Sequence, residues 1–137
     1  MKDKLEQNLA NFERALLSLE TNIVKIKVKP QTDEDFDIYR DSTIQRFEYS
    51  LELSKKLMAN YIEYIDAEVK GQKLILKKAF EFDLIDDDIW FKMIDDRNIT
   101  SHEYSESLAQ ELLENIYIYA IKLRNFCEII KKEIERL

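Results

Sequence analysis

The sequence predicts an all-α fold, an up-and-down bundle of three long and two short helices in a single domain, 1–137. Two observations favour this fold class. Apolar residues recur at alternating spacings of three and four along most of the chain, which places them on one face of an α-helix. The chain also has only one glycine and one proline, far fewer than the turns of a sandwich, barrel or doubly wound sheet require.

The first long helix is expected from about Asp3 to Lys25, with Asp3 as its N-cap and a loop over 27–35. Its apolar stripe comprises Leu5, Leu9, Phe12, Leu16, Leu19 and Ile23. The second long helix is expected from about Phe36 to Lys70. Gly71 is placed to end it in a left-handed C-cap conformation.

The last long helix is expected from Ser105 or Ser107 to Arg136, and Ser107 with Gln110 fits a capping box. Cys127 lies beside its stripe, as a small core residue would. Further apolar residues lie off this stripe: Leu113, Ile118, Ala120 and Ile121. A helix that is apolar on more than one side needs more than one neighbour, so we expect a two-fold homodimer.

Two short helices are expected between the long ones. The first covers Leu74 to Phe82 and should place Leu76, Ala79 and Phe80 in the core. The second starts with the apolar run 89–94, directly after three consecutive aspartates, 86–88. Three carboxylates could bind a metal, but an aspartate before a helix also accepts hydrogen bonds from its free N–H groups. We interpret one as the N-cap and all three as structural.

The composition excludes several kinds of site. One glycine rules out a glycine-rich phosphate loop, and one cysteine with one histidine rules out a thiolate zinc cluster or a multi-histidine metal site within one chain. We expect no metal and no cofactor. No signal region and no membrane-length apolar run is present, which favours a reducing, cytoplasmic setting without membrane contact.

The net charge of −7 argues against coating nucleic acid by bulk attraction, although the 21 basic residues are distributed unevenly. One cluster comprises Lys25, Lys27 and Lys29. A second comprises Lys70, Lys73, Lys77 and Lys78. Such clusters are usually solvated faces, but a local basic groove remains compatible with the sequence.

The polar segment 95–104 contains the only histidine, His102, with Arg97 five residues before it and Tyr104 two residues after it. On one continuous helix, five residues turn the chain by about 500°, so Arg97 and His102 would diverge by about 140°. The residues between them are weaker helix formers, and we therefore expect the helix to end near Arg97 or Asn98. A short loop would then carry His102 and place it on the same side as Tyr104.

Arginine and histidine together suit chemistry on a phosphodiester. Histidine can move a proton near neutral pH, and the arginine fork matches phosphate oxygens. In RNA the ribose 2′-OH supplies the nucleophile, so His102 would transfer the proton while Arg97 stabilises charge on the phosphorus-bound oxygens. The ordinary alternative is a structural histidine near a helix end and a surface ion pair of the arginine, and spacing alone does not decide between them.

The motif Arg97-x4-His102-x-Tyr104 resembles that of HEPN-domain (HepT-like) toxins from HEPN–MNT toxin–antitoxin pairs, a family also called nucleotidyltransferase substrate-binding proteins. The stretches 44–53, 76–80 and 90–98 continue the resemblance in order. It implies a helical-bundle homodimer whose two motif segments line a shared cleft. It also implies a metal-independent endoribonuclease that acts on tRNA or other cellular RNA.

In this resemblance Arg97 and His102 are catalytic, while Asn98 and Glu48 support the active site. The family further implies a cognate MNT-type nucleotidyltransferase antitoxin that transfers AMP from ATP onto the motif tyrosine, here Tyr104. Two other functions stay open. One is a non-catalytic subunit that binds substrate for a nucleotidyltransferase, and the other is a helical interaction module without chemistry.

Overall fold

The computed structural model describes residues 2–102 and 105–137, apart from the side chains of residues 99–102. Over these residues the chain forms five helices and no strand. They are α1 (Lys2–Lys27), α2 (Phe36–Ile65), α3 (Gln72–Glu81), α4 (Ile89–His102) and α5 (Glu106–Glu135). The predicted all-α bundle of three long and two short helices is confirmed.

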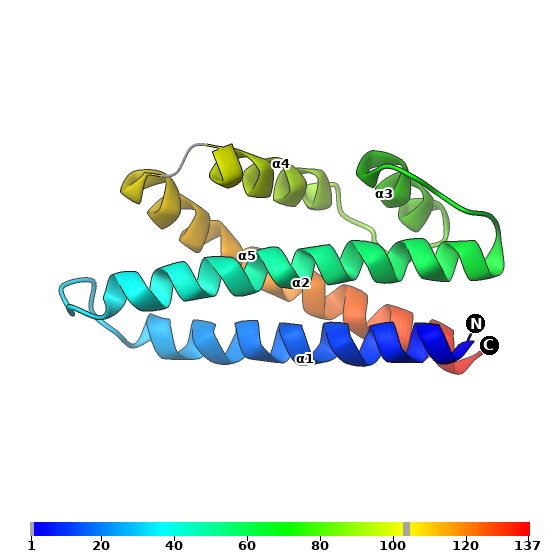
Figure 1. Cartoon of the computed structure of the whole chain (residues 1–137), viewed down its shortest axis with the longest axis horizontal. Coiled ribbons are helices and arrows are strands. Elements are labelled where there is room, and N and C mark those ends of the chain that lie inside the picture. Colours follow the sequence, from blue (N-terminus) through cyan, green and yellow to red (C-terminus); the bar gives the residue numbers. More distant parts are fainter. Residues whose placement is uncertain (1, 103–104) are drawn as a thin grey trace.

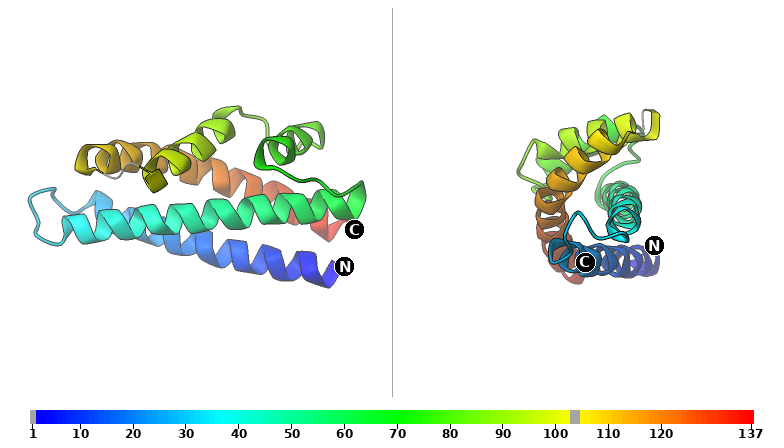
Figure 2. Two further views of the ribbon diagram at one scale, coloured as in Figure 1. Left: turned by 45° about the horizontal axis from the view of Figure 1, so that its top comes forward. Right: turned by 90° about the vertical axis from the view of Figure 1, so that its left-hand side faces the viewer.

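The three long helices form the body of the molecule. α1 and α2 lie side by side and antiparallel, and α5 crosses behind them so that both termini meet at one end (Figure 1). α3 and α4 follow one another along the other side of the bundle. Viewed along the bundle, α2 lies between α1 on one side and α4 on the other (Figure 2).

The core is built from the predicted apolar stripes. All six apolar residues of the α1 stripe are buried. Aromatic rings connect three helices, because the Phe126 ring of α5 lies 5.6 Å from both Phe12 of α1 and Trp90 of α4. Cys127 is fully buried in the same core, as predicted. Of the expected α3 contacts, Leu76 and Ala79 are fully buried and Phe80 packs against the core from its edge.

The second long helix ends earlier than predicted. α2 stops at Ile65, and Gly71 precedes α3 with φ +90° instead of ending α2. The final turns of α2 contain no basic residue, while Glu63 and Asp66 lie near a helix end whose dipole disfavours carboxylates. The chain therefore leaves the helix at Ile65, six residues before the glycine.

Two predicted helix caps are also wrong. α1 already includes Lys2, so Asp3 lies within the first turn, where its charge still suits the helix dipole. At α5 the N-cap is Ser105, whose Oγ accepts a hydrogen bond from the Leu108 N–H. The capping box of Ser107 and Gln110 does not form, because Ser107 already lies inside the helix.

The surplus of apolar residues on α5 is partly explained within the chain. Leu113 is buried against Ile26 and Phe36, and Ala120 lies in the main core. Ile118 and Ile121 are exposed, at 50% and 60%. Half of the surplus on which the dimer prediction rests is thus covered by the chain itself. Among the described helices, none is long and apolar enough to cross a bilayer.

Candidate functional site

The orientation of α4 is fixed by contacts on two of its faces. Trp90, Met93 and Ile94 are buried in the core at the spacing of one helix face. Nearer its end, Asp96 accepts a hydrogen bond from the Tyr119 hydroxyl and a longer one, 3.4 Å, from the Asn115 amide. Both donors belong to α5, so α4 cannot rotate without breaking them.

This orientation turns Arg97 toward α2. Its Nε lies 3.6 Å from a carboxylate oxygen of Glu52 and 4.0 Å from one of Glu48. The two glutamates are one helical turn apart on α2, so they present their carboxylates on the same face. All three side chains are partly exposed, and the next residue, Asn98, is also partly exposed. The result is a charged cluster that solvent and a ligand can reach.

Glu48 is the member of this cluster with an altered affinity for protons. Burial raises the pKa of its carboxyl, Arg97 opposes that rise, and the negative charge of Glu52 adds to it. The carboxyl consequently retains its proton at higher pH than an exposed glutamate would. Protonation also removes one of the two negative charges beside Arg97, which favours the approach of an anionic ligand to the guanidinium.

The helix continues through the motif, contrary to prediction. α4 runs to His102 without a break after Arg97 or Asn98. Each weak helix former in this stretch costs only a few tenths of a kcal/mol, which the packed first half of α4 and the anchor at Asp96 offset. Positions 97 and 102 are therefore about 140° apart around one helix axis.

The structure thus brings Arg97 together with Glu48 but does not place position 102 on the Arg97 face of α4. Tyr104 lies outside the described residues, so its predicted position on the same surface as His102 stays a prediction. Two residues that form or position the cluster, Glu52 and Asp96, were not singled out from the sequence. Glu52 could have been found from its four-residue spacing to Glu48, whereas the role of Asp96 depends on α5 packing.

No group of three or more potential metal ligands occurs among the described residues. Of the three aspartates before α4, Asp87 has the predicted structural role at the start of the helix. Asp87 accepts a hydrogen bond of 3.0 Å from the Ile89 N–H and pairs with Lys122 of α5 at 2.8 Å. The hydrogen bond from Lys122 and that from Ile89 lower the pKa of the Asp87 carboxyl.

Fold and site together define a small all-helical protein with a charged cluster between its fourth and second helices. A family model described as "Nucleotidyltransferase substrate binding protein like" matches residues 7–132, and the chain belongs to this family. The family resemblance inferred from the motif is confirmed.

Two relatives from Haemophilus influenzae show the same relationship along nearly the whole chain. One, named "Probable ribonuclease HepT", is 34% identical over an alignment of 132 residues that covers 89% of this chain and 89% of the relative. The other is a solved structure described as the substrate-binding domain of a nucleotidyltransferase. It is 30% identical, superposes with a TM-score of 0.79, and is matched over 90% of this chain and 98% of its own.

Proposed function

We propose that this protein is a metal-independent endoribonuclease and the toxin of a toxin–antitoxin pair. The observation that carries the proposal is the 34% identity, over 89% of both chains, to a relative named as a ribonuclease. The partly exposed Arg97 supports it, because a permanent cation beside solvent can bind the phosphate of an incoming RNA. tRNA or another cellular RNA is the substrate.

The reaction is cleavage by the RNA's own 2′-hydroxyl. As the O2′–P bond forms, the P–O5′ bond breaks, leaving a 2′,3′-cyclic phosphate and a 5′-hydroxyl. His102 takes up or returns the proton, and Arg97 stabilises the charge on the phosphorus-bound oxygens. Asn98 and Glu48 support the site. Burial raises the pKa of the Glu48 carboxyl, which lessens the cost of its protonation when a phosphate enters.

The continuous helix α4 supports a composite site. Because positions 97 and 102 face different directions in one chain, Arg97 acts together with His102 of the partner subunit in a two-fold homodimer.

The proposed off switch is Tyr104. A cognate MNT-type nucleotidyltransferase antitoxin transfers AMP from ATP to its hydroxyl, with release of pyrophosphate. The attached AMP is bulky and anionic, and it lies two residues from His102 in the sequence. It would fill the cleft and engage Arg97 in place of the RNA phosphate.

The test is incubation of total RNA with the wild-type protein and with His102→Ala, with and without EDTA. We expect cleavage by the wild type in both conditions, products ending in a 2′,3′-cyclic phosphate, and no cleavage by His102→Ala at an unchanged dimer mass. Cleavage that survives the substitution, or that EDTA abolishes, contradicts this mechanism.

Mixing two inactive variants tests the composite site. Arg97→Ala and His102→Ala proteins that are unfolded together and refolded should form mixed dimers, half of the total, in which one of the two sites is intact. About one quarter of the wild-type activity should return. If both residues of a site come from the same chain, no intact site forms and the mixture stays inactive.

A second candidate function follows from the family description and from the solved relative. Both describe a protein that binds substrate for a nucleotidyltransferase. In that case the free protein cleaves no RNA, and its addition changes the activity of the transferase. The same RNA incubation, together with an AMP-transfer assay on the reconstituted pair, separates the two functions.

A further inference from the structure

A basic groove runs between α1 and α2, outside the Arg97 cluster. It consists of two adjoining hollows, of about 290 Å³ and about 340 Å³, that share Arg14, Ser18 and Arg46. Lys25 extends it at one end, and Tyr49 borders it at the other. These volumes are at the lower end for enclosed ligand sites, which suits a surface track better than a small-molecule pocket.

The positive charges of this groove are not neutralised locally. Neither hollow is lined by an aspartate or glutamate. In the part of the chain that the structure describes, Arg14 and Lys25 form no ion pair, and both are exposed. Arg46 donates to neutral oxygens only, at 2.7 Å to the Ser18 hydroxyl and to the hydroxyl and carbonyl of Ser42.

The neighbouring carboxylates of α1 are directed elsewhere. Glu13 pairs with Lys131 at 3.5 Å, and Glu20 pairs with Arg124 through two hydrogen bonds, one of them 2.9 Å. Both partners belong to α5, on the other side of α1. In a chain of net charge −7, this arrangement leaves one helix face positive.

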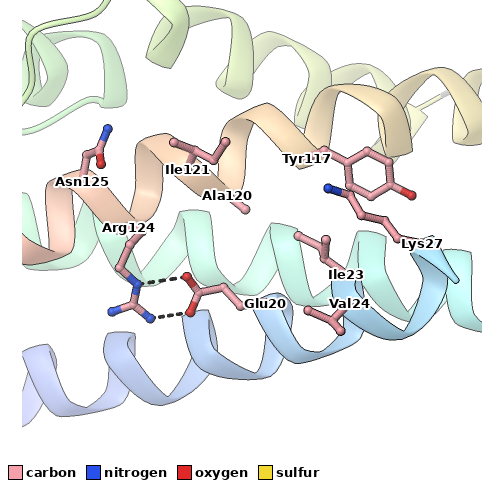
Figure 3. A pocket seen from close by; sticks show the side chains of 9 residues that line it. All are labelled: Glu20, Ile23, Val24, Lys27, Tyr117, Ala120, Ile121, Arg124 and Asn125. Carbon is pink, nitrogen blue, oxygen red and sulfur yellow. Dashed lines mark hydrogen bonds and ion pairs between the residues drawn. The ribbon is translucent and has the colours of Figure 1, made fainter.

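The hollow between α1 and α5 provides the contrast. There the ion pair of Glu20 and Arg124 cancels its own charge, and the remaining surface includes the apolar side chains of Ile23, Val24 and Ile121 (Figure 3). Among the described residues of that lining, Lys27 is the one cation outside the ion pair, and its Nζ lies over the Tyr117 ring, 4.7 Å from the centroid. The α1/α2 groove, in comparison, alternates cations with hydroxyl and amide groups.

The length of the groove along α1 suits a strand of nucleic acid. Arg14, Ser18, Thr21 and Lys25 follow one another at spacings of four, three and four on a single face of α1. Eleven residues of helix extend about 16 Å, and successive phosphates of one stacked strand advance about 3.4 Å along the helix axis, so the groove is long enough for more than one phosphate. Tyr49 is 61% exposed, which leaves its ring available for stacking on a base.

The groove also lies at the level of the proposed catalytic arginine. Arg46 and Tyr49 border the groove, and Glu48, which contacts Arg97, lies between them in the sequence. Arg46 and Glu48 differ by about 3 Å along the helix axis but by about 200° around it. The groove and Arg97 are therefore on opposite sides of the exposed ridge of α2, between α1 and α4 (Figure 2).

We propose that the α1/α2 groove is an RNA-binding subsite that holds the phosphate backbone next to the scissile phosphate. Arg14, Lys25 and Arg46 bind phosphates, and Tyr49 stacks on a base where the strand crosses α2. The assignment of RNA as the ligand rests on the proposed ribonuclease function.

The experiment measures RNA binding without cleavage. A labelled single-stranded RNA of mixed sequence is titrated with His102→Ala protein and with the same protein carrying Arg14→Glu and Lys25→Glu, and fluorescence anisotropy reports Kd. The matched control carries Lys73→Glu and Lys77→Glu, two exposed lysines on α3, far along the bundle (Figure 1). Both double variants change the net charge equally, and circular dichroism checks that both are folded.

Each phosphate contact on a single strand contributes about 0.7 to the magnitude of the slope of log K against log salt concentration. At about 0.1 M salt one contact therefore raises the binding constant about fivefold relative to about 1 M salt. The groove variant should therefore bind about 25-fold more weakly, with a slope smaller by about 1.4, while the control stays within about threefold of the parent. Equal affinity and slope in the groove variant and the parent overturn the proposal. So does an equal loss in the control, which would indicate bulk charge.

Failure of this inference and failure of the proposed function have different outcomes. If the wild type cleaves no RNA but the groove variant loses binding, the subsite stands and the ribonuclease assignment fails. If the wild type cleaves and the groove variant binds and cleaves like it, the subsite is wrong. A groove variant that keeps RNA binding but loses the nucleotidyltransferase partner would assign the groove to an acidic protein surface instead.

Discussion

Tyr119→Phe should loosen the attachment of α4 to the bundle. Tyr119 is 1% exposed, its ring stacks on Phe47 at 5.5 Å between centroids, and its hydroxyl donates to a carboxylate oxygen of Asp96. Phenylalanine retains the ring and its packing and removes only the hydroxyl. Any loss of stability therefore measures the hydrogen bond that fixes the residue before Arg97.

The magnitude follows from the nature of the bond. Burial, and then the hydrogen bond to Asp96, raise the pKa of Tyr119, so the hydroxyl is a donor throughout the working pH range. A hydrogen bond to a charged acceptor contributes about 1.5–3 kcal/mol, and Asn115 remains as a weaker donor at 3.4 Å. For 137 residues, this range corresponds to a decrease in Tm of about 5–10 °C.

The assay is urea and thermal unfolding followed by circular dichroism, with Tyr117→Phe as the matched control. Tyr117 is on the same helix and partly buried, but its hydroxyl makes no hydrogen bond to another described residue, and its ring contact with Lys27, 4.7 Å to the centroid, survives the change. Protein concentration is held fixed because a dimer would make Tm concentration-dependent. If both variants lose stability within about 0.5 kcal/mol of each other, the anchoring role of Tyr119 is refuted.

Three further outcomes are expected. In urea titrations, Glu48→Gln should gain stability relative to wild type as pH rises from about 4 to about 7. The pKa of Glu48 is raised in the folded protein, so the stability that this carboxyl contributes is complete below its unfolded-state pKa and is lost as pH rises through its folded-state pKa. Gly71→Ala should cost about 1–2 kcal/mol in the same assay, all of it backbone strain at φ +90°, since no atom lies within 4 Å of an added Cβ. The Cys127 thiol should react with Ellman's reagent at pH 7 only after denaturation, since burial raises its pKa to about 11 and covers the sulfur.

The long helices were predictable because each carries a continuous apolar stripe. In α1 every residue of the predicted stripe is buried, and the actual ends lie within two residues of the expected ones. Periodicity determines which face is buried without knowledge of the neighbours. The same reasoning located the buried run of α4 and the structural aspartate before it, because both signals are local in sequence.

Helix ends were predicted less well, because several local signals compete there. Gly71 is permissive for a C-cap, yet α2 ends at Ile65, where carboxylates face the negative end of the dipole. Ser105 and Ser107 are equally good N-caps by composition, and the choice of Ser105 depends on how the chain enters α5. α4 shows the opposite error, since its packed first half carries the helix through residues of low propensity.

The sequence predicted which residues form part of the candidate site but not how they contact one another. Arg97 and Glu48 were named from the motif and the family resemblance, but their ion pair joins residues 49 positions apart and required the packing of α4 beside α2. Glu52, which lies closer to Arg97 than Glu48 does, and the anchor of Asp96 on Tyr119 are likewise products of tertiary packing. The positive α1/α2 groove could not be predicted from the sequence either. Its charge is not neutralised because Glu13 and Glu20 of α1 pair with Lys131 and Arg124 of α5, and these pairs form only in the folded bundle.

The two grounds for a dimer concern different surfaces. The apolar surplus of α5 is reduced to Ile118 and Ile121, and Ile121 lies at the hollow between α1 and α5. The proposed composite site instead needs a second copy near Arg97, which pairs with Glu52 of α2, and α2 and α4 lie on the other side of the bundle from that hollow (Figure 2). A partner that supplies His102 must therefore approach the α2–α4 side, adjacent to the proposed RNA groove. Replacing Ile121 should then leave complementation between Arg97→Ala and His102→Ala chains intact, even if the α1/α5 face also binds a protein.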